Sequence, residues 1–108
     1  MKLLIIVTVE DLQEDMSHIL HDSGITNMNV VPVTGYRKNA RCSALGWFGR
    51  GSACAQTHSL LMFSFTSEEI AHQTVCLIDR YNAERAQIIP PRAFVLDISE
   101  FSKITPLG

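Results

Sequence analysis

The sequence predicts an α+β fold, a ferredoxin-like βαββαβ sandwich with a long loop between strands 2 and 3. Its segments follow the order strand, helix, strand, loop, strand, helix and strand, which this sandwich accommodates directly. The chain has 108 residues, of which 46% are hydrophobic and 19% are charged, so its length and apolar content suit one core. We therefore expect a single domain over residues 1–108.

The first strand and the first helix are indicated by hydrophobic patterning. Residues 3–9, LLIIVTV, form an apolar and β-branched run, which predicts a strand in the middle of a sheet. An amphipathic helix with acidic residues at its positive end is expected to begin after Thr8-x-x-Asp11 and to stop at Gly24. Its apolar positions are Leu12, Met16, Ile19 and Leu20.

The second strand is marked by the valines of residues 28–36. Pro32 indicates an edge position or a bulge there, because proline cannot donate to a sheet ladder. Residues 37–58 have no sustained period of either kind, so we expect a loop of 22 residues. Loops of this length within compact domains are usually functional or disordered. The third strand, SLLMFSF, follows at residues 59–65.

A capping box, Thr66-x-x-Glu69, predicts where the second helix begins. Its helical spacing is carried by Ile70, Thr74, Leu77, Ile78 and Tyr81, and Cys76 is expected to pack beside this stripe. Residues 82–93 are read as a connection that contains two prolines. The alternation of Phe94, Leu96 and Ile98 predicts the fourth strand.

Composition excludes several classes of protein. The net charge of -2 gives no overall basic footprint for nucleic acid. The apolar run near the start is too short for a membrane span and lacks a small-residue cleavage site. Three cysteines without a C-x-x-C pair favour reduced thiols in a cytosolic setting. We expect a cytoplasmic protein that neither binds nucleic acid nor inserts into a membrane.

Charge is unevenly distributed along the chain. No acidic residue lies between Ser23 and Ser67. Four of the nine basic residues, Arg37, Lys38, Arg41 and Arg50, lie in that segment. The local positive field suits an anionic ligand or an acidic partner surface.

The stretch GITNMNVVPVTGYRKN, residues 24–39, resembles the approach to the long T-loop of the nitrogen-regulatory PII proteins and their PII-like relatives. The start MKLLIIV, the second helix with its preceding Thr-Ser-Glu-Glu and the short path to the fourth strand are similar too. The resemblance covers residues 1 to about 101. It implies a homotrimer whose sheets pack around a three-fold axis, with small effectors, typically adenine nucleotides, bound between subunits.

The resemblance also implies that residues 37–58 are the T-loop equivalent, which inserts into or covers a target protein such as a transporter or an enzyme. Within this loop, the expected partner contacts are Arg41, Trp47, Phe48 and Arg50, since Trp and Arg often carry binding energy at interfaces. Alternatively, Trp47 and Phe48 fold back and hold the loop against the body of the protein.

Several positions depart from the family pattern. The connection YNAERAQIIPPR contains no glycine, so it cannot form the family's close backbone nest around a triphosphate. Asp97 and Ser99 lie near where the family usually supplies two arginines, and Asn39 takes the place of a glutamine. These departures favour a smaller or less charged ligand than ATP with 2-oxoglutarate, such as an adenosine mono- or dinucleotide or bicarbonate.

Six residues are the expected ligand contacts. Gly35 allows close approach of the backbone, Arg37 pairs with an anion, and Asn39 offers both donor and acceptor. Arg85 and Arg92 flank the second connection and could replace the missing cations, or remain solvated surface charges. The full set is Gly35, Tyr36, Arg37, Asn39, Arg85 and Arg92.

A metal-binding protein similar to the CutA metal-tolerance proteins is the alternative. Cys42, Cys54 and His58 supply three soft ligands suited to copper or zinc, although their spacing matches no known finger. Cys42 and Cys54 could instead close the loop as a disulfide, with free thiols the expected state. His18, His21 and His72 fall on helices. No nucleophile, base and oxyanion donor can be grouped from spacing, so we expect no enzymatic activity.

Overall fold

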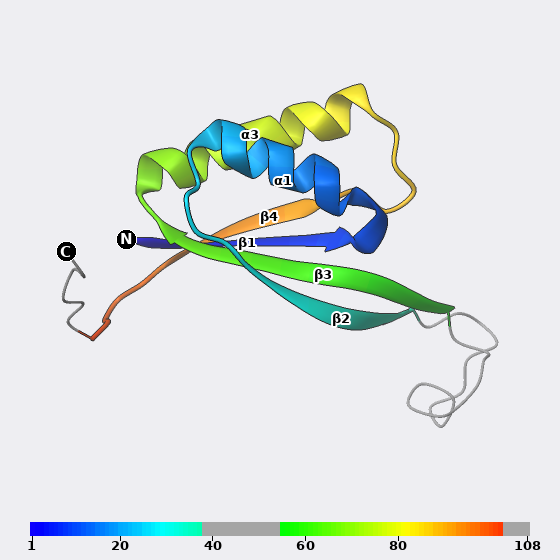
Figure 1. The fold of residues 1–108 in the computed structure, drawn as a ribbon, viewed down its shortest axis with the longest axis horizontal. Helices are drawn as coiled ribbons and strands as arrows, with labels where there is room; N and C mark the ends of the chain where they lie inside the picture. The colour runs from blue at the N-terminus through cyan, green and yellow to red at the C-terminus, as the bar shows by residue number, and fades with distance from the viewer. Residues whose placement is uncertain (38–54, 103–108) are drawn as a thin grey trace.

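The computed structural model describes residues 1–37 and 55–102. One four-stranded sheet has the order β2-β3-β1-β4, with both helices over one of its faces (Figure 1). Every neighbouring pair of strands is antiparallel. The predicted ferredoxin-like α+β fold is thereby confirmed. The elements are β1 Lys2–Val9, η1 Glu10–Leu12, α1 Gln13–Ser23, β2 Asn29–Arg37, β3 Ala55–Thr66, α3 Glu68–Glu84 and β4 Arg92–Asp97.

Strand order follows from the composition of the strands. The apolar β1 is central and pairs with both β3 and β4. Pro32 lies on β2, at the edge of the sheet, where the proline removes no hydrogen bond that a central strand would need. The edge position predicted from Pro32 is confirmed.

The ends of α1 differ in how well the sequence predicted them. Gly24 ends the helix in the left-handed region, with φ of 94°, which glycine adopts without the strain of a side chain. At the other end, the Thr8 hydroxyl bonds to the carbonyl of Val9 and caps nothing. The short 3-10 turn η1 precedes α1 instead.

The second helix begins one residue later than predicted. Ser67 is the N-cap of α3, and its hydroxyl accepts from the backbone N–H of Ile70 at 3.3 Å. Thr66 remains the last residue of β3, paired with Lys2. The capping box predicted at Thr66 was therefore wrong by one position, because Thr66 is still paired with Lys2 in the sheet.

The hairpin of β2 and β3 is longer than the sequence indicated. Arg37 pairs with Ala55, and Thr34 pairs with His58, so Arg37 and residues 55–58 belong to strands. The loop predicted at 37–58 was too long at both ends. Backbone pairing extends this hairpin beyond the helices, and the polar residues there show no apolar alternation that a sequence pattern could detect.

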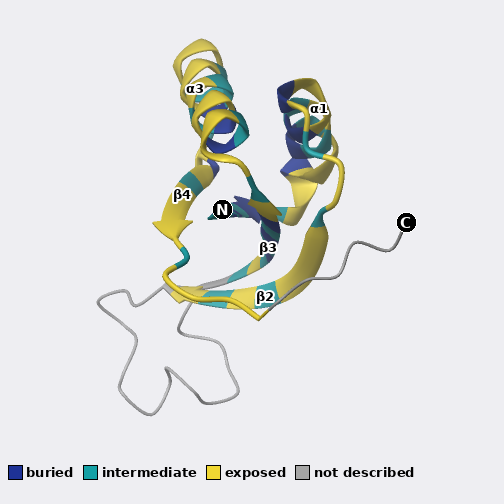
Figure 2. Ribbon diagram, turned by 90° about the vertical axis from the view of Figure 1, so that its left-hand side faces the viewer, coloured by how far each residue is buried: buried dark blue, intermediate teal, exposed yellow. Residues whose placement is uncertain are grey.

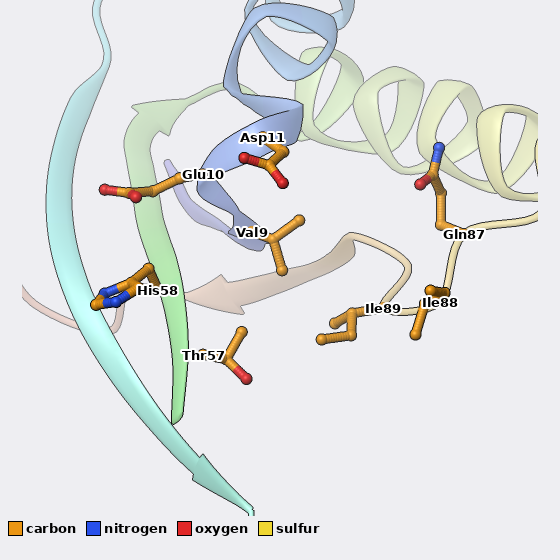
Figure 3. A pocket seen from close by; sticks show the side chains of 8 residues that line it. All are labelled: Val9, Glu10, Asp11, Thr57, His58, Gln87, Ile88 and Ile89. Atoms are coloured by element: carbon orange, nitrogen blue, oxygen red, sulfur yellow. The ribbon is translucent and has the colours of Figure 1, made fainter. Parts of the chain in front are cut away.

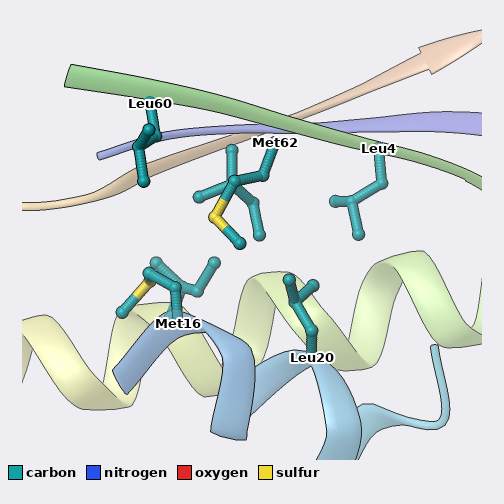
Figure 4. Close-up of a cluster of buried hydrophobic side chains, with 7 residues drawn as sticks. Leu4, Met16, Leu20, Leu60 and Met62 are labelled. Carbon is teal, nitrogen blue, oxygen red and sulfur yellow. The ribbon is translucent and has the colours of Figure 1, made fainter. Parts of the chain in front are cut away.

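The core lies between the sheet and the two helices (Figure 4). Met16 and Leu20 of α1 and Ile78 of α3 pack against side chains of β1 and β3. The buried cluster consists of Leu4, Ile6, Met16, Leu20, Leu60, Met62 and Ile78. Cys76 is exposed on α3 rather than packed as expected, because the buried stripe passes through Ala71, Thr74 and Ile78.

The opposite face of the sheet carries no helix among the described residues (Figure 2). The strand pairings place mainly apolar side chains on it. Opposite residues of antiparallel strands share a face, so the pairings place Leu3, Phe65 and Leu96 in one row. Phe65 is 57% exposed and Phe94 is 48% exposed. We call this surface the open sheet face, and its rows comprise Leu3, Ile5, Val7, Val31, Leu61, Phe63, Phe65, Phe94 and Leu96.

Candidate ligand-binding site

A pocket of about 490 Å³ lies at the base of the β2–β3 hairpin. Three segments line it: the end of β1 with the start of η1, the first part of β3, and the connection between α3 and β4 (Figure 3). Its volume falls in the range of roughly 300–1,000 Å³ typical of small-molecule sites. The lining residues are Val9, Glu10, Asp11, Thr57, His58, Gln87, Ile88 and Ile89.

The pocket combines an apolar wall with acidic residues. Ile88 and Ile89 form the apolar side, and Ile88 is 97% exposed in the single subunit. Glu10 and Asp11 contribute two carboxyl groups, whose negative charge opposes the approach of a polyphosphate. An apolar ring system with hydrogen-bonding groups fits this lining better than a highly charged anion.

A second pocket, of about 270 Å³, adjoins the first along the α3–β4 connection. It shares Ile88 and Ile89 with the first pocket and is also lined by Arg92. Arg92 therefore lies beside the connection, and its role as a ligand contact remains a prediction. Ile88 and Ile89 are thus exposed to both pockets.

A hydrogen-bonded network ties this connection to both helices. The Tyr81 hydroxyl of α3 donates to Asp15 Oδ2 of α1 at 2.7 Å. Arg85 Nη1 lies 3.3 Å from the same carboxylate oxygen, and its guanidinium carbon lies 5.2 Å from the centre of the Tyr81 ring. Gln87 Nε2 donates to the Tyr81 hydroxyl at 3.4 Å. Because Gln87 also lines the first pocket, the network positions one wall of it.

The surroundings of Tyr81 raise the pKa of its hydroxyl. Partial burial is the larger cause, and the hydrogen bond to Asp15 adds to it, while Arg85 acts in the opposite direction. The folded chain therefore holds this proton more tightly than the unfolded chain. The resulting stabilisation is fully present below the ordinary tyrosine pKa of 10.0 and is lost as the pH rises through the raised pKa.

Replacing Tyr81 by phenylalanine should lower the free energy of unfolding by about 1–2 kcal/mol, because the hydrogen bonds to Asp15 and Gln87 are lost while the ring remains. Amide exchange of residues 85–89 should accelerate. Urea unfolding and hydrogen exchange measure the two effects. Tyr36→Phe on β2 is the matched control and should change stability by less than about 0.5 kcal/mol. Equal effects at both positions would contradict a positioning role for the network.

The predicted ligand residues lie in several different parts of the structure. Gly35 pairs with Thr57, a lining residue of the first pocket, and Tyr36 follows it on β2. Arg92 lines the second pocket, whereas Arg85 is engaged by Asp15 and Tyr81. The side chains of Arg37 and Asn39 lie outside what the structure describes. All six ligand assignments remain predictions.

Sequence reasoning missed most residues that line the first pocket. Glu10 and Asp11 were read as helix-start residues, and His58 was placed in the loop rather than on β3. The pair Ile88-Ile89 offered a signal, because two large apolar residues in a proline-containing connection are typical of an interaction site. The other lining residues become neighbours only when the strands pair.

The predicted partner residues of the loop lie outside the described residues. This applies to Arg41, Trp47, Phe48 and Arg50, and also to Cys42 and Cys54 of the metal alternative. Within residues 1–37 and 55–102, no group of three or more histidine, cysteine or acidic side chains gathers around a common point. The loop-based metal site thus remains an untested alternative.

Asp97 is neutralised by an ion pair. Lys2 hydrogen-bonds to its carboxylate across the paired strands β1 and β4. This hydrogen bond lowers the pKa of Asp97 and raises the pKa of Lys2. The lysine offsets the repulsion of phosphate that the sequence had indicated at Asp97.

The arrangement of sheet, helices and hairpin is the fold of the PII-like nitrogen-regulatory proteins. CPII, a nitrogen-regulatory PII-like protein from Thiomonas intermedia K12 solved with ADP, AMP and bicarbonate, matches with a TM-score of 0.62 and 16% identity over 95% of this chain and 94% of CPII. Its apo form matches with a TM-score of 0.59 and 15% identity, over 90% and 87% of the two chains. The B. subtilis GlnK–ATP complex gives a TM-score of 0.66 and 18% identity over 91% and 81%.

The resemblance to PII-like proteins expected from the sequence is confirmed for the fold. No protein-family model and no curated protein matches the sequence. Neither α1 nor α3, the helices of the described chain, is long and apolar enough to cross a membrane.

Proposed function

We propose that this protein is a non-enzymatic, cytoplasmic regulatory protein that binds a small effector and contacts a target protein through the loop between β2 and β3. In this proposal the chain is a single PII-like domain, and the loop is its T-loop equivalent. The observation that carries the proposal is the pocket at the base of this hairpin, bounded by residues of β3 and of the α3–β4 connection. A ligand there would touch β3, one of the two strands that lead into the loop.

The effector we propose is an adenine nucleotide of low charge, such as AMP or ADP, or bicarbonate. CPII was solved with all three. In this chain, the apolar wall of Ile88 and Ile89 suits an adenine ring, and Arg92 supplies a cation in the adjoining second pocket. Glu10 and Asp11 should disfavour ATP relative to AMP, because each further phosphate adds negative charge next to two carboxylates.

We further propose that three copies assemble through the open sheet face. Exposed phenylalanines, valines and leucines cover that face, and contiguous apolar surfaces of this kind usually mark protein interfaces. Assembly would remove Phe65, Phe94 and Leu96 from water. It would also place a neighbouring subunit beside the pocket edge, completing a cleft that one subunit leaves open.

Coupling between effector and target would run through the two strands of the hairpin. Gly35 pairs with Thr57, which lines the pocket, and Arg37 and Ala55 are the last described pair before the loop. An effector that binds one arrangement of the loop more tightly shifts the population toward it. The target would then meet Arg41, Trp47, Phe48 and Arg50.

Replacing Gly35 by alanine tests the effector site without disturbing the fold. An added Cβ would lie 3.8 Å from the Thr57 Cβ, an ordinary contact distance, so stability should be unchanged or slightly higher. A ligand that approaches the Gly35 backbone would collide with the methyl group. Isothermal titration with AMP, ADP, ATP and bicarbonate should show an affinity for the preferred ligand at least about tenfold weaker, or about 1.4 kcal/mol.

Gly24→Ala is the matched control for this experiment. Gly24 ends α1 with φ of 94°, so alanine should destabilise the fold by about 1 kcal/mol while leaving the affinity for the ligand unchanged. No heat with any of the four ligands in the wild-type protein would overturn the proposed function. Equal affinity of wild type and Gly35→Ala would remove Gly35 from the site.

A further inference from the structure

Two metal-ligating side chains meet on the solvent side of α3, away from the pocket and the core. Cys76 Sγ lies 3.6 Å from His72 Nε2. The residues are four apart on one helix, so their side chains lie on the same face one turn apart. Both are exposed, and neither takes part in the core or in the lining of the first pocket. The pair is thus open to a ligand from solution.

The separation of the two atoms matches the demands of a tetrahedral metal ion. Zinc binds thiolate sulfur at about 2.3 Å and imidazole nitrogen at about 2.0–2.1 Å, so a tetrahedral angle between them sets the sulfur and nitrogen roughly 3.5–3.6 Å apart. The observed 3.6 Å therefore needs little rearrangement to accept the ion. Because the helix fixes the two backbone positions one turn apart, binding orders only the two side chains and not the backbone.

The charges around the pair favour a cation. Glu69 lies one turn before His72, and Asp79 lies one turn after Cys76, on the same exposed face of α3. Two carboxylates flanking a thiol and an imidazole lower the energy of a divalent ion between them. Arg80, one turn after Cys76, carries the opposite charge, so one negative charge remains uncompensated among these three neighbours.

We infer that His72 and Cys76 form a surface site for zinc or a similar soft divalent ion. The helix supplies two protein ligands, and water fills the other positions, because no third cysteine, histidine or acidic group of the described chain gathers with them. The thiol releases its proton on binding, so affinity rises with pH. A bound ion would link two side chains one turn apart and so stabilise that turn of α3. The buried face of the same helix contributes part of the core.

Cobalt titration of the full-length Cys42→Ser/Cys54→Ser protein tests this site. The sequence has three cysteines, so Cys76 is then the single thiol, and any sulfur-to-cobalt charge-transfer absorption in the near ultraviolet comes from it. We expect this absorption to saturate at one cobalt per chain and to disappear when zinc is added. Zinc should also raise the melting temperature, because it binds the folded helix.

His72→Asn in the same background should weaken cobalt binding roughly 10²-fold, since it removes the chelating partner, and Cys76→Ser should abolish the absorption. His21→Asn, at an exposed histidine of α1, is the matched control and should leave the titration unchanged. Absence of the thiolate absorption in the parent protein, or an unchanged affinity in His72→Asn, would overturn the site. The outcome is independent of nucleotide binding, so it is separable from the test of the proposed function.

Discussion

Replacing Phe65 and Phe94 together by aspartate should convert the proposed trimer to a monomer. Phe65 and Phe94 are 57% and 48% exposed on the open sheet face, so neither is needed to fill the core of one subunit. In the proposed trimer, however, each aspartate would be buried in an apolar interface without a partner, and burial of an unpaired charge costs several kcal/mol. Light scattering should give the mass of three chains for the wild type and of one chain for the variant.

The control for this experiment places the same charges on the other side of the molecule. Gln73 and Ala83 are exposed positions of α3, so Gln73→Asp/Ala83→Asp should keep the mass of three chains. Circular dichroism of all three proteins should agree, because the substituted side chains lie outside the buried cluster. A monomeric wild type, or a trimeric Phe65→Asp/Phe94→Asp variant, would contradict assembly through this face.

Replacing Met16 by alanine should reduce the free energy of unfolding by about 2–5 kcal/mol. Met16 is 0% exposed and packs in the cluster between α1 and the sheet. Alanine would leave a cavity there, because the surrounding side chains come from four elements and cannot all collapse into it. Urea unfolding at one fixed protein concentration measures the loss, since the proposed assembly would make stability depend on concentration.

Ile88→Ala is the comparison for the core substitution. It removes a similar amount of apolar side chain from a residue that is 97% exposed, so stability should change by less than about 0.5 kcal/mol. If Met16→Ala cost less than about 1 kcal/mol, the helix would not be anchored to the sheet as the structure indicates. Retained effector binding in Met16→Ala would place the destabilisation in the core and not in the pocket.

Much of the fold could be predicted from the sequence because the signals are local. The apolar run of β1 indicated a central strand, Pro32 indicated an edge, and Gly24 indicated the end of α1, and the structure has all three. Each signal depends on backbone geometry or on burial of a neighbouring face. The boundaries were less accurate: Ser67 caps α3 in place of Thr66, and β3 begins at Ala55.

The candidate site was much less predictable. Its lining joins residues of β1 and η1 to residues of β3 and of the α3–β4 connection, segments that are distant in the sequence. Arg85 illustrates the difficulty. In the sequence it reads as a cation without a partner, but in the fold it pairs with Asp15, 70 positions away, beside Tyr81. Contacts between residues so far apart in the chain produce no periodic pattern in the sequence.

The sequence by itself determined the order and type of the elements, the central and edge strands and the capacity for one core, because apolar period, proline and glycine act through the local backbone. Only the tertiary structure decided how far the hairpin extends and which acidic and apolar residues border the pocket. It also decided which arginine is free to meet a ligand and which face of the sheet no helix covers. These depend on pairing between distant segments, where contact energies outweigh local preference.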